Sequence, residues 1–531
     1  LPEPHTGPVP EPGLGGLHTG GVRTLVPWPV DILDLPDPEE PEPMVMEGVC
    51  RQSHGALLRA AQERRRRQQE AGLILNRVVY DAVHFVPAGT DRVPGEALLF
   101  ESRFESGNLR RVVQVSKHAY DLVLACDSNT RGHTQWFNYR VRNMRAGEEY
   151  RMNIINMMKP DSLFSSGMRP LRYSEKDAKE HSVGWVRTGS KICYFQNQYP
   201  SQAAPKKKKP SAAAAAAGAA PREPVQSYYT LSMALSFPHA GDTVYVAQCY
   251  PYTYTMLQGY LGSLVERRSA CMRRDQLCLS YGRHAVDLLT VTDFGADAAE
   301  IAQRKVVVIS GRVHPGETNA SWMMQGLIDA VTADTPAARS LRAGVVLKIV
   351  PMLNPDGVIL GNYRCSIVGV DLNRQWSEPS EQTMPTIYHL KRLMRSLAAQ
   401  EQLLFFCDLH GHSRKRNIFV YGCEGTKGER RLKERVFPRL LDEYTPHFSA
   451  PSCSYKVLRS KETTGRVVVW RQFNLAYSFT LEASMCGPDY GALQGAHFNT
   501  QHLREMGAAF VPALLDLADP QQGKVLSVYA E

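Results

Sequence analysis

Apolar residues in the second half of the chain form short continuous runs, and helix-like segments separate one run from the next. KVVVIS, GVVLKIVPML and LLFFCDL are three such runs, and SWMMQGLIDAVT and TIYHLKRLMRSLAA lie between them. Continuous apolar strands that alternate with helices are typical of an α/β sheet with both faces covered. We therefore expect an α/β domain over residues 248–520, with its ligand site at the carboxyl ends of the strands.

The segment before this domain has a different pattern. Residues 91–247 contain short β-rich runs separated by turn residues at fairly regular spacing, which predicts a small all-β sandwich. The clearest alternation is YTLSMALSF at 229–237, where large apolar side chains occupy one face and small or polar ones the other. A low-complexity segment at 202–224, rich in lysine and alanine, predicts an exposed loop within this domain.

The two ends of the chain follow neither pattern. Residues 1–90 carry many prolines and glycines and predict a largely disordered region, apart from a charged helix over 54–75. Residues 521–531 are expected to form a carboxyl-terminal tail. The first thirty residues lack the apolar core of a signal peptide, and no apolar run reaches the roughly 20 residues that span a bilayer, so we expect no membrane association.

The charge and the cysteines of the chain indicate which partners and which redox compartment to expect. The net charge is +9, with the excess concentrated in ERRRR at 63–67 and KKKK at 206–209. This balance favours acidic partners, although solvated charge is the simpler interpretation of the two runs, and no nucleic-acid-binding motif accompanies them. Eleven cysteines are present, no two of them as Cys-x-x-Cys, and several, such as Cys407, lie in apolar runs. They indicate buried thiols in a reducing, cytosolic compartment.

Polar residues able to do chemistry follow four of the apolar runs. HPGE follows the first run, NPDG the second, the HGH of DLHGH the third, and Glu482 ends the fourth, LAYSFTLE. Each has a simple structural interpretation, since NPDG is a turn signal and Asp371, further along, could cap a helix. Four such clusters at the same end of one sheet favour a shared site instead.

Three of these residues have the chemistry of a metal site. His314, Glu317 and His410 supply two imidazoles and a carboxylate, the ligand set of a catalytic zinc that keeps one position open for water or substrate. Glu482 is a candidate general base for the attack of water on a carbonyl group.

Three further residues complete the chemistry. Arg364 is a candidate for stabilising the oxyanion of a tetrahedral intermediate. Asn373 and Arg374 offer an amide and a planar fork, which suit a terminal carboxylate. A metal, a base, an oxyanion donor and a carboxylate clamp together describe a carboxypeptidase.

The motifs HPGE, NPDG, DLNR, DLHGHS and FTLEASMCG resemble the metallocarboxypeptidases of the carboxypeptidase A type, in the cytosolic carboxypeptidase branch. The match covers about residues 250–517, and LFESRFESGNLRRV and TQWFNYRV resemble the amino-terminal domain of that branch. The resemblance implies a mixed, mostly parallel, eight-stranded type of sheet with helices on both faces, after the small all-β sandwich, and one zinc ion per chain. It assigns the zinc ligands to His314, Glu317 and His410, the catalytic glutamate to Glu482, the oxyanion arginine to Arg364, and the carboxylate pair to Asn373 and Arg374.

The chain departs from the family pattern in two places. Secreted relatives carry an arginine just before the ligand glutamate, where this chain has Gly316. They also have a mobile tyrosine that closes over the substrate, for which Tyr455 is the nearest candidate.

The resemblance also implies a specificity. In the family, the segment before the catalytic glutamate forms the floor of the pocket for the last side chain, and here it offers Lys461 and Arg466, with Arg466 nearer the expected position. A buried arginine would pair with a side-chain carboxylate and reject apolar ends, whereas an exposed loop arginine is the simpler alternative.

The cytosolic branch removes glutamates from acidic protein tails, those of tubulin above all. The resemblance therefore implies deglutamylation of polyglutamylated or acidic-tailed proteins, with tubulin and microtubules as partners and neither membrane nor nucleic acid. It leaves open whether side-chain, branch-point or genetically encoded glutamates are removed. It implies a cytoplasmic location and leaves open a microtubule-associated or nuclear fraction.

Two other functions fit part of this pattern. A zinc deacylase acting on small acylated amino acids would use the same carboxylate clamp. A non-catalytic module that binds acidic tails would be expected to lack a ligand or the base, and neither is missing.

Overall fold

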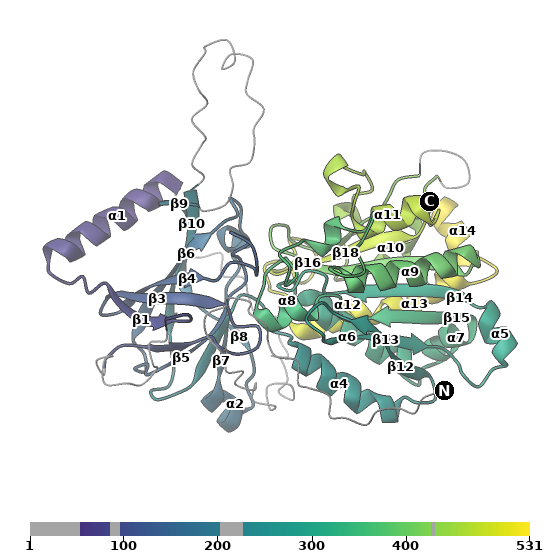
Figure 1. Ribbon diagram of the computed structural model, residues 1–531, viewed down its shortest axis with the longest axis horizontal. Coiled ribbons are helices and arrows are strands. Elements are labelled where there is room, and N and C mark those ends of the chain that lie inside the picture. Colours follow the sequence, from purple (N-terminus) through teal and green to yellow (C-terminus); the bar gives the residue numbers. More distant parts are fainter. Residues whose placement is uncertain (1–53, 85–95, 202–226, 426–430, 531) are drawn as a thin grey trace, which may run out of the picture.

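The computed structural model describes residues 54–84, 96–201, 227–425 and 431–530. It places two domains side by side, a β domain and an α/β domain (Figure 1). The predictions for residues 1–53 and for the loop at 202–224 lie outside the described residues. No helix in the described ranges is both long and apolar enough to cross a lipid bilayer.

Two sheets form the β domain, as the regular short runs predicted. The strand orders are β1-β3-β4-β6-β10-β9 and β2-β5-β11-β7-β8. The sheets meet through buried aromatic side chains, and the ring centroids of Phe100 and Tyr120, one from each sheet, lie 5.3 Å apart. The strands are β1 (Arg77–Asp81), β2 (Leu99–Glu101), β3 (Leu109–Ser116), β4 (Ala119–Leu124), β5 (Asn138–Arg142), β6 (Glu149–Met157), β7 (Leu171–Ser174), β8 (Val186–Arg187), β9 (Ser190–Pro200), β10 (Ser227–Ser236) and β11 (Val244–Ala247).

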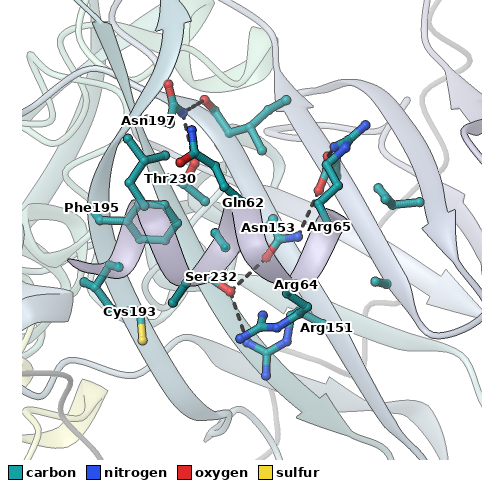
Figure 2. A pocket seen from close by; sticks show the side chains of 18 of the residues that line it. Gln62, Arg64, Arg65, Arg151, Asn153, Cys193, Phe195, Asn197, Thr230 and Ser232 are labelled. Carbon is teal, nitrogen blue, oxygen red and sulfur yellow. Dashed lines mark hydrogen bonds and ion pairs between the residues drawn. The ribbon is translucent and has the colours of Figure 1, made fainter. Parts of the chain in front are cut away.

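The charged helix predicted over 54–75 is α1 (His54–Glu70), which ends earlier because Gly72 adopts a left-handed φ of +66°. It crosses the outer face of the six-stranded sheet, above a cavity of about 580 Å³ (Figure 2). Thr230 and Ser232, on the polar side of the alternating segment, line this cavity and are only 5% and 6% exposed. Both faces of β10 are therefore covered, one by the domain core and the other by a charged helix.

One seven-stranded mixed sheet, in the order β12-β13-β15-β14-β16-β18-β17, forms the described part of the α/β domain. The prediction of a mixed sheet with helices is confirmed, whereas the expected eight strands and mostly parallel pairing differ from what is found. Three neighbouring pairs are parallel, β15–β14, β14–β16 and β16–β18, and the other three are antiparallel. The outer strands belong to a hairpin and a short return strand, which need no helical crossover. The strands are β12 (Met272–Leu279), β13 (Ala285–Val291), β14 (Lys305–Gly311), β15 (Val345–Val350), β16 (Leu403–His412), β17 (Ile418–Tyr421) and β18 (Ser478–Ser484).

Helices cover both faces of this sheet because its central strands are apolar on both sides. On β14, Val306 and Val308 pack with α9 and α11, while Val307 and Ile309 belong to the core that includes α6, α7, α10, α12 and α13. The helices are α2 (Glu175–His181), α4 (Tyr254–Arg267), α5 (Ala298–Gln303), α6 (Asn319–Thr332), α7 (Pro336–Gly344), α8 (Pro355–Leu360), α9 (Pro385–Ala399), α10 (Lys433–Tyr444), α11 (Gly465–Gln472), α12 (Thr500–Ala508), α13 (Phe510–Ala518) and α14 (Gly523–Ala530). Within the predicted carboxyl-terminal tail, α14 is a packed helix whose Val525 is 3% exposed.

The two domains are joined by specific polar contacts. Glu105 of the β domain accepts the backbone N–H groups of Tyr254 and Thr255 at 2.7 and 3.1 Å, and so caps the amino terminus of α4. After α8, Gly361 adopts a φ of +73°, and an added Cβ there would lie 2.4 Å from the carbonyl oxygen of Gly107. The close approach of these two backbones requires glycine and fixes α8 against the β domain.

Candidate functional site

A cavity of about 410 Å³ opens at the carboxyl ends of β14, β16 and β18, where the sequence predicted the site. Both domains line it. Its charged lining residues are Lys159, Glu317, Arg364, Arg374, Arg414, Lys456, Lys461, Arg466 and Glu482.

His314, Glu317 and His410 lie together in this cavity, with donor atoms within 4.8 Å of one another. Each imidazole presents Nδ1 to the carboxylate, since His314 Nδ1 lies 2.8 Å from Glu317 Oε1 and His410 Nδ1 lies 2.8 Å from Glu317 Oε2. All three residues are at most 6% exposed. The turn HPGE brings the first two together locally, and the end of the buried strand β16 supplies the third.

The opposite nitrogen of each imidazole contacts a second carboxylate. His314 Nε2 lies 3.1 Å from Asp371 Oδ1, and His410 Nε2 lies 2.7 Å from Asp408 Oδ2. Asp408 also accepts a hydrogen bond from Ser310 on the neighbouring strand at 2.8 Å. A carboxylate behind each imidazole fixes the ring and leaves Nδ1 for a metal.

The charges in this cluster suit a divalent cation. Burial opposes ionisation of Glu317, but the two imidazoles outweigh it, and the pKa of Glu317 lies well below its ordinary value. Burial also lowers the pKa of His410, yet Asp408 and Glu317 outweigh this effect and hold that pKa well above its ordinary value. Among the described residues, neither Glu317 nor Asp408 pairs with an arginine or a lysine. A zinc ion held by His314, Glu317 and His410 would supply positive charge next to these buried carboxylates.

Glu482 lies on β18 beside the three candidate metal ligands His314, Glu317 and His410, which we call the metal cluster. The parallel pairing of β16 and β18 places it in register with His410, and it lines the same cavity. A carboxylate at this position can accept a proton from a water molecule that attacks a substrate held at the metal.

Arg364 is bound to the carboxylate that holds His314. Its Nε and Nη2 donate to Asp371 Oδ2 at 2.7 and 2.6 Å. Burial alone would lower the pKa of Arg364, but Asp371 and Glu317 raise it above its ordinary value, so the guanidinium stays charged. Asp371 also caps the short helix at Leu372–Arg374 by accepting the N–H of Asn373 at 3.0 Å. The helix-cap interpretation of Asp371 is therefore correct, and the same side chain also orients two residues of the site.

A carboxylate from the β domain anchors the segment that carries Arg364. Asp127, 3% exposed, accepts the backbone N–H groups of Tyr363, Arg364 and Cys365 at 2.6, 2.7 and 2.7 Å. Burial raises the pKa of Asp127 to about 6, and the three donors act against that rise. The sequence analysis did not identify Asp127, which lies more than 230 residues away from its partners.

We expect Asp127→Asn to loosen this segment, because an amide replaces one acceptor oxygen by a donor that faces backbone N–H groups. The free energy of unfolding should fall by roughly 2–3 kcal/mol, the contribution of charge-assisted hydrogen bonds. Hydrogen exchange at the amides of Tyr363, Arg364 and Cys365 should accelerate, as measured by mass spectrometry. The control is Glu149→Gln, which affects only an exposed ion pair with Lys191. Unchanged exchange in the Asp127 variant would show that the segment is held by other contacts.

Asp127 also belongs to a second group of possible metal donors, with His133 and Cys365. Both oxygens of Asp127 already accept backbone N–H groups, and burial, with the nearby Asp127 charge, raises the pKa of the Cys365 thiol to about 12. A protonated thiol is a poor metal ligand, so this group suits anchoring of the segment better than metal binding.

Asn373 and Arg374 lie on the cavity wall next to the metal cluster. Asn373 Oδ1 accepts the N–H of Gly465 at 3.0 Å, which fixes the amide and leaves Nδ2 as the donor. Arg374 Nη1 donates to the carbonyl oxygen of Asn373 at 2.7 Å, and the side chain is 28% exposed. The two residues offer adjacent donors of the kind that bind a carboxylate.

Lys461 and Arg466 also line the cavity, but their environments differ. Lys461 is the last residue of a short 3-10 helix that has no buried residue. Arg466, on α11, is only 4% exposed. The guanidinium of Arg466 lies 5.5 Å from the ring centroid of Tyr421. Burial lowers the pKa of Arg466, an effect that a carboxylate ligand would offset. The alternative of an exposed loop arginine is therefore wrong.

Some of the singled-out residues lie outside the site. Tyr455, the candidate for closing the pocket, does not line the cavity; it packs beside Gly422 and under the guanidinium of Arg435, 5.0 Å from its ring centroid. In NPDG, Asp356 instead accepts hydrogen bonds from Ser280 and Gly282 in the β12–β13 turn. At Gly316, an added Cβ would lie 2.7 Å from the Tyr363 ring, so this chain has no space for an arginine there.

Two family models match consecutive parts of the chain. A model described as the cytosolic carboxypeptidase N-terminal domain matches residues 100–211, and a model described as zinc carboxypeptidase matches residues 257–501.

Curated relatives match over most of the chain. Cytosolic carboxypeptidase 2 of Danio rerio is 43% identical over 432 residues, which are 81% of this chain and 57% of that protein. Cytosolic carboxypeptidase 1 of Homo sapiens is 42% identical over 466 residues, 84% of this chain and 37% of that protein. The chain thus spans about half or less of the length of these relatives.

Solved structures share the fold. A metallo-carboxypeptidase from Burkholderia cenocepacia has a TM-score of 0.61 at 22% identity and covers 79% of this chain and 98% of its own. A metallo-carboxypeptidase from Pseudomonas aeruginosa, in complex with (2-guanidinoethylmercapto)succinic acid, has a TM-score of 0.61 at 21% identity, covering 79% of this chain and 100% of its own.

Proposed function

We propose that this chain, a member of the zinc carboxypeptidase family with the amino-terminal domain of its cytosolic members, is an active carboxypeptidase. Its proposed reaction is the removal of terminal glutamates from acidic protein tails, such as those of tubulin. The observation that carries the specificity is the buried guanidinium of Arg466, which has no carboxylate within 4.0 Å among the described side chains and whose Nε has no hydrogen-bond partner. A buried cation that forms no ion pair within 4.0 Å among the described residues, inside a substrate cavity, favours an anionic ligand.

The charge of the whole cavity supports this substrate class. Seven lysines and arginines line it, against the two glutamates of the catalytic cluster. A cavity of one predominant sign attracts ligands of the opposite charge and raises their association rate. The two carboxylates of a terminal glutamate, one on the main chain and one on the side chain, are present whether the residue is genetically encoded or attached through a side chain.

Each residue of the site has a role in this reaction. Asn373 and Arg374 bind the main-chain carboxylate of the terminal residue, and Arg466 binds its side-chain carboxylate. Arg364 stabilises the negative charge that develops on the carbonyl oxygen. Glu482 takes a proton from the attacking water and returns it to the leaving amine. A zinc ion at His314, Glu317 and His410 would supply Lewis acidity for this step.

The thiols and the names of the relatives support a proposal for where the reaction takes place. The ten cysteines of the described residues are all free, in accordance with a reducing compartment. Relatives of this chain are named cytosolic carboxypeptidases. We propose that the activity is cytoplasmic and acts on acidic-tailed proteins such as tubulin in microtubules.

Arg466→Ala tests the specificity. A shielded charge-assisted pair contributes about 2–4 kcal/mol, so catalytic efficiency on peptides that end in glutamate should fall about 30- to 1000-fold relative to peptides that end in leucine. The measurement is the ratio of kcat/KM for the two peptides, with zinc content determined in parallel.

The matched control is Arg374→Ala, which should harm both peptides alike because it removes a donor to the shared main-chain carboxylate. An unchanged ratio in the Arg466 variant would show that another cation determines the selectivity, and Lys461 would be tested next. Hydrolysis of small acylated amino acids, with no release of glutamate from peptides, would instead favour a zinc deacylase.

A further inference from the structure

The β domain supplies one cation to the cavity of the α/β domain. Lys159 follows β6 and lines the same cavity as the metal cluster and Glu482. Its Nζ donates to Tyr363 Oη and, at 2.7 Å, to Ser413 Oγ, and it lies 4.4 Å from the centroid of the Tyr363 ring. Its backbone carbonyl accepts a hydrogen bond from Tyr194 Oη on β9. Lys159 is therefore held at both ends.

The ammonium group of Lys159 is not neutralised by these contacts. Its two acceptors are neutral hydroxyl groups, and no carboxylate among the described residues lies within 4.0 Å of it. The neighbouring cation Arg414 differs, because it pairs with Asp161 at 2.5 Å. An oriented lysine without a counter-ion, on the wall of a substrate cavity, is suited to bind an anionic group of the substrate.

The position of Lys159 identifies which part of the substrate it faces. The groups assigned to the terminal residue cluster around α11, since Asn373 binds the N–H of Gly465 and Arg466 is the next residue. Lys159 contacts none of these groups and instead binds Tyr363 and Ser413, which lie beside Arg364 and beyond the end of β16. A peptide whose last residue is held near α11 therefore continues past the metal cluster toward Lys159.

We propose that Lys159 is a specificity-determining residue that binds the side-chain carboxylate of the residue before the scissile bond, so that the site selects two consecutive glutamates. This inference rests on the proposed carboxypeptidase activity. It makes the β domain a part of the substrate site. It also explains why Lys159 of the β domain binds the hydroxyl groups of Tyr363 and Ser413 in the α/β domain.

The test uses the full chain and two peptides that both end in glutamate and differ only in the preceding residue, glutamate or glutamine. In the unmodified protein, kcat/KM should be about 10-fold higher for the peptide with two glutamates, the effect of one charge-assisted contact. Lys159→Met, which keeps the length of the side chain, should abolish this preference and leave kcat/KM for the glutamine peptide within about twofold. Lys159→Arg should retain the preference.

The control variant is Lys191→Met, which removes an exposed lysine of the same domain that pairs with Glu149 outside the cavity. It should change neither peptide. An equal loss on both peptides in Lys159→Met would show that the lysine only supports Tyr363 and Ser413, and an unchanged preference would exclude the contact; either result overturns the inference. Because both peptides end in the same residue, the comparison is independent of Arg466. A failure of the proposed terminal specificity would appear only in the glutamate-to-leucine ratio.

Discussion

Replacement of Glu482 by glutamine should lower kcat by about 10²- to 10⁴-fold, the usual contribution of a general base. Glutamine keeps the size and hydrogen-bonding reach of the side chain but cannot accept the proton of the attacking water. Glu482 is in register with His410 and lines the cavity without itself belonging to the buried group of metal donors. The variant should therefore retain zinc and a near-normal KM while turnover is lost.

Steady-state kinetics and metal analysis on the same preparation check this result. Glu462→Gln is the matched control, because Glu462 lies in the segment near the pocket but forms an exposed ion pair with Arg471. It should behave as the unmodified protein. Near-normal turnover in the Glu482 variant would show that Glu482 is not the general base.

Replacement of His314 or His410 by alanine should abolish both zinc binding and activity. Each imidazole supplies one of three donors, and the buried Glu317 carboxylate would then face an incomplete ligand set and an unbalanced charge. Since α/β packing on both faces of the sheet is independent of these side chains, the folded domain should persist. Stoichiometric zinc, measured by metal analysis, is expected only in the unmodified protein.

His412→Ala is the control for metal content. His412 lines the same cavity, but its Nδ1 accepts the backbone N–H groups of Arg414 and Lys415 at 3.2 and 2.8 Å, and so faces its own loop. That variant should keep zinc. Full zinc occupancy in the His314 or His410 variant would contradict the ligand assignment.

The sequence by itself determined the parts of the site that depend on local spacing. His314 and Glu317 are three residues apart in a turn, and His410 ends a continuous apolar strand, so the pattern of buried strands was enough to place them at one edge of a sheet. The sequence also contains a local signal for Asp408. It lies two residues before His410, and alternate residues of a strand share a face.

Tertiary structure decided the contacts that join distant segments. Asp371 reaches His314 across 57 residues, and Asp127 and Lys159 reach Tyr363 from the other domain across more than 200. The hydrophobic periodicity of the sequence cannot predict such pairs, because they depend on how the two domains and the loops at the ends of their strands come together. The same holds for Tyr455, which proximity in sequence suggested for closing the pocket. The fold places its ring beside Gly422 and under Arg435, outside the cavity.

The edges of the sheet also separate what the sequence predicted from what the fold decided. Apolar runs identified the central strands, whose burial on both faces leaves no polar side, but β12, β13 and β17 take part in antiparallel pairs. Of these pairs, only β12–β13 is joined by a short hairpin. Strand direction at an edge is determined by connection length and by the neighbour that a strand meets in space. Hydrophobic patterning therefore fixes which side chains are buried, whereas the order of strands, the joining of the domains and the charge lining the cavity arise only when those buried faces pack together.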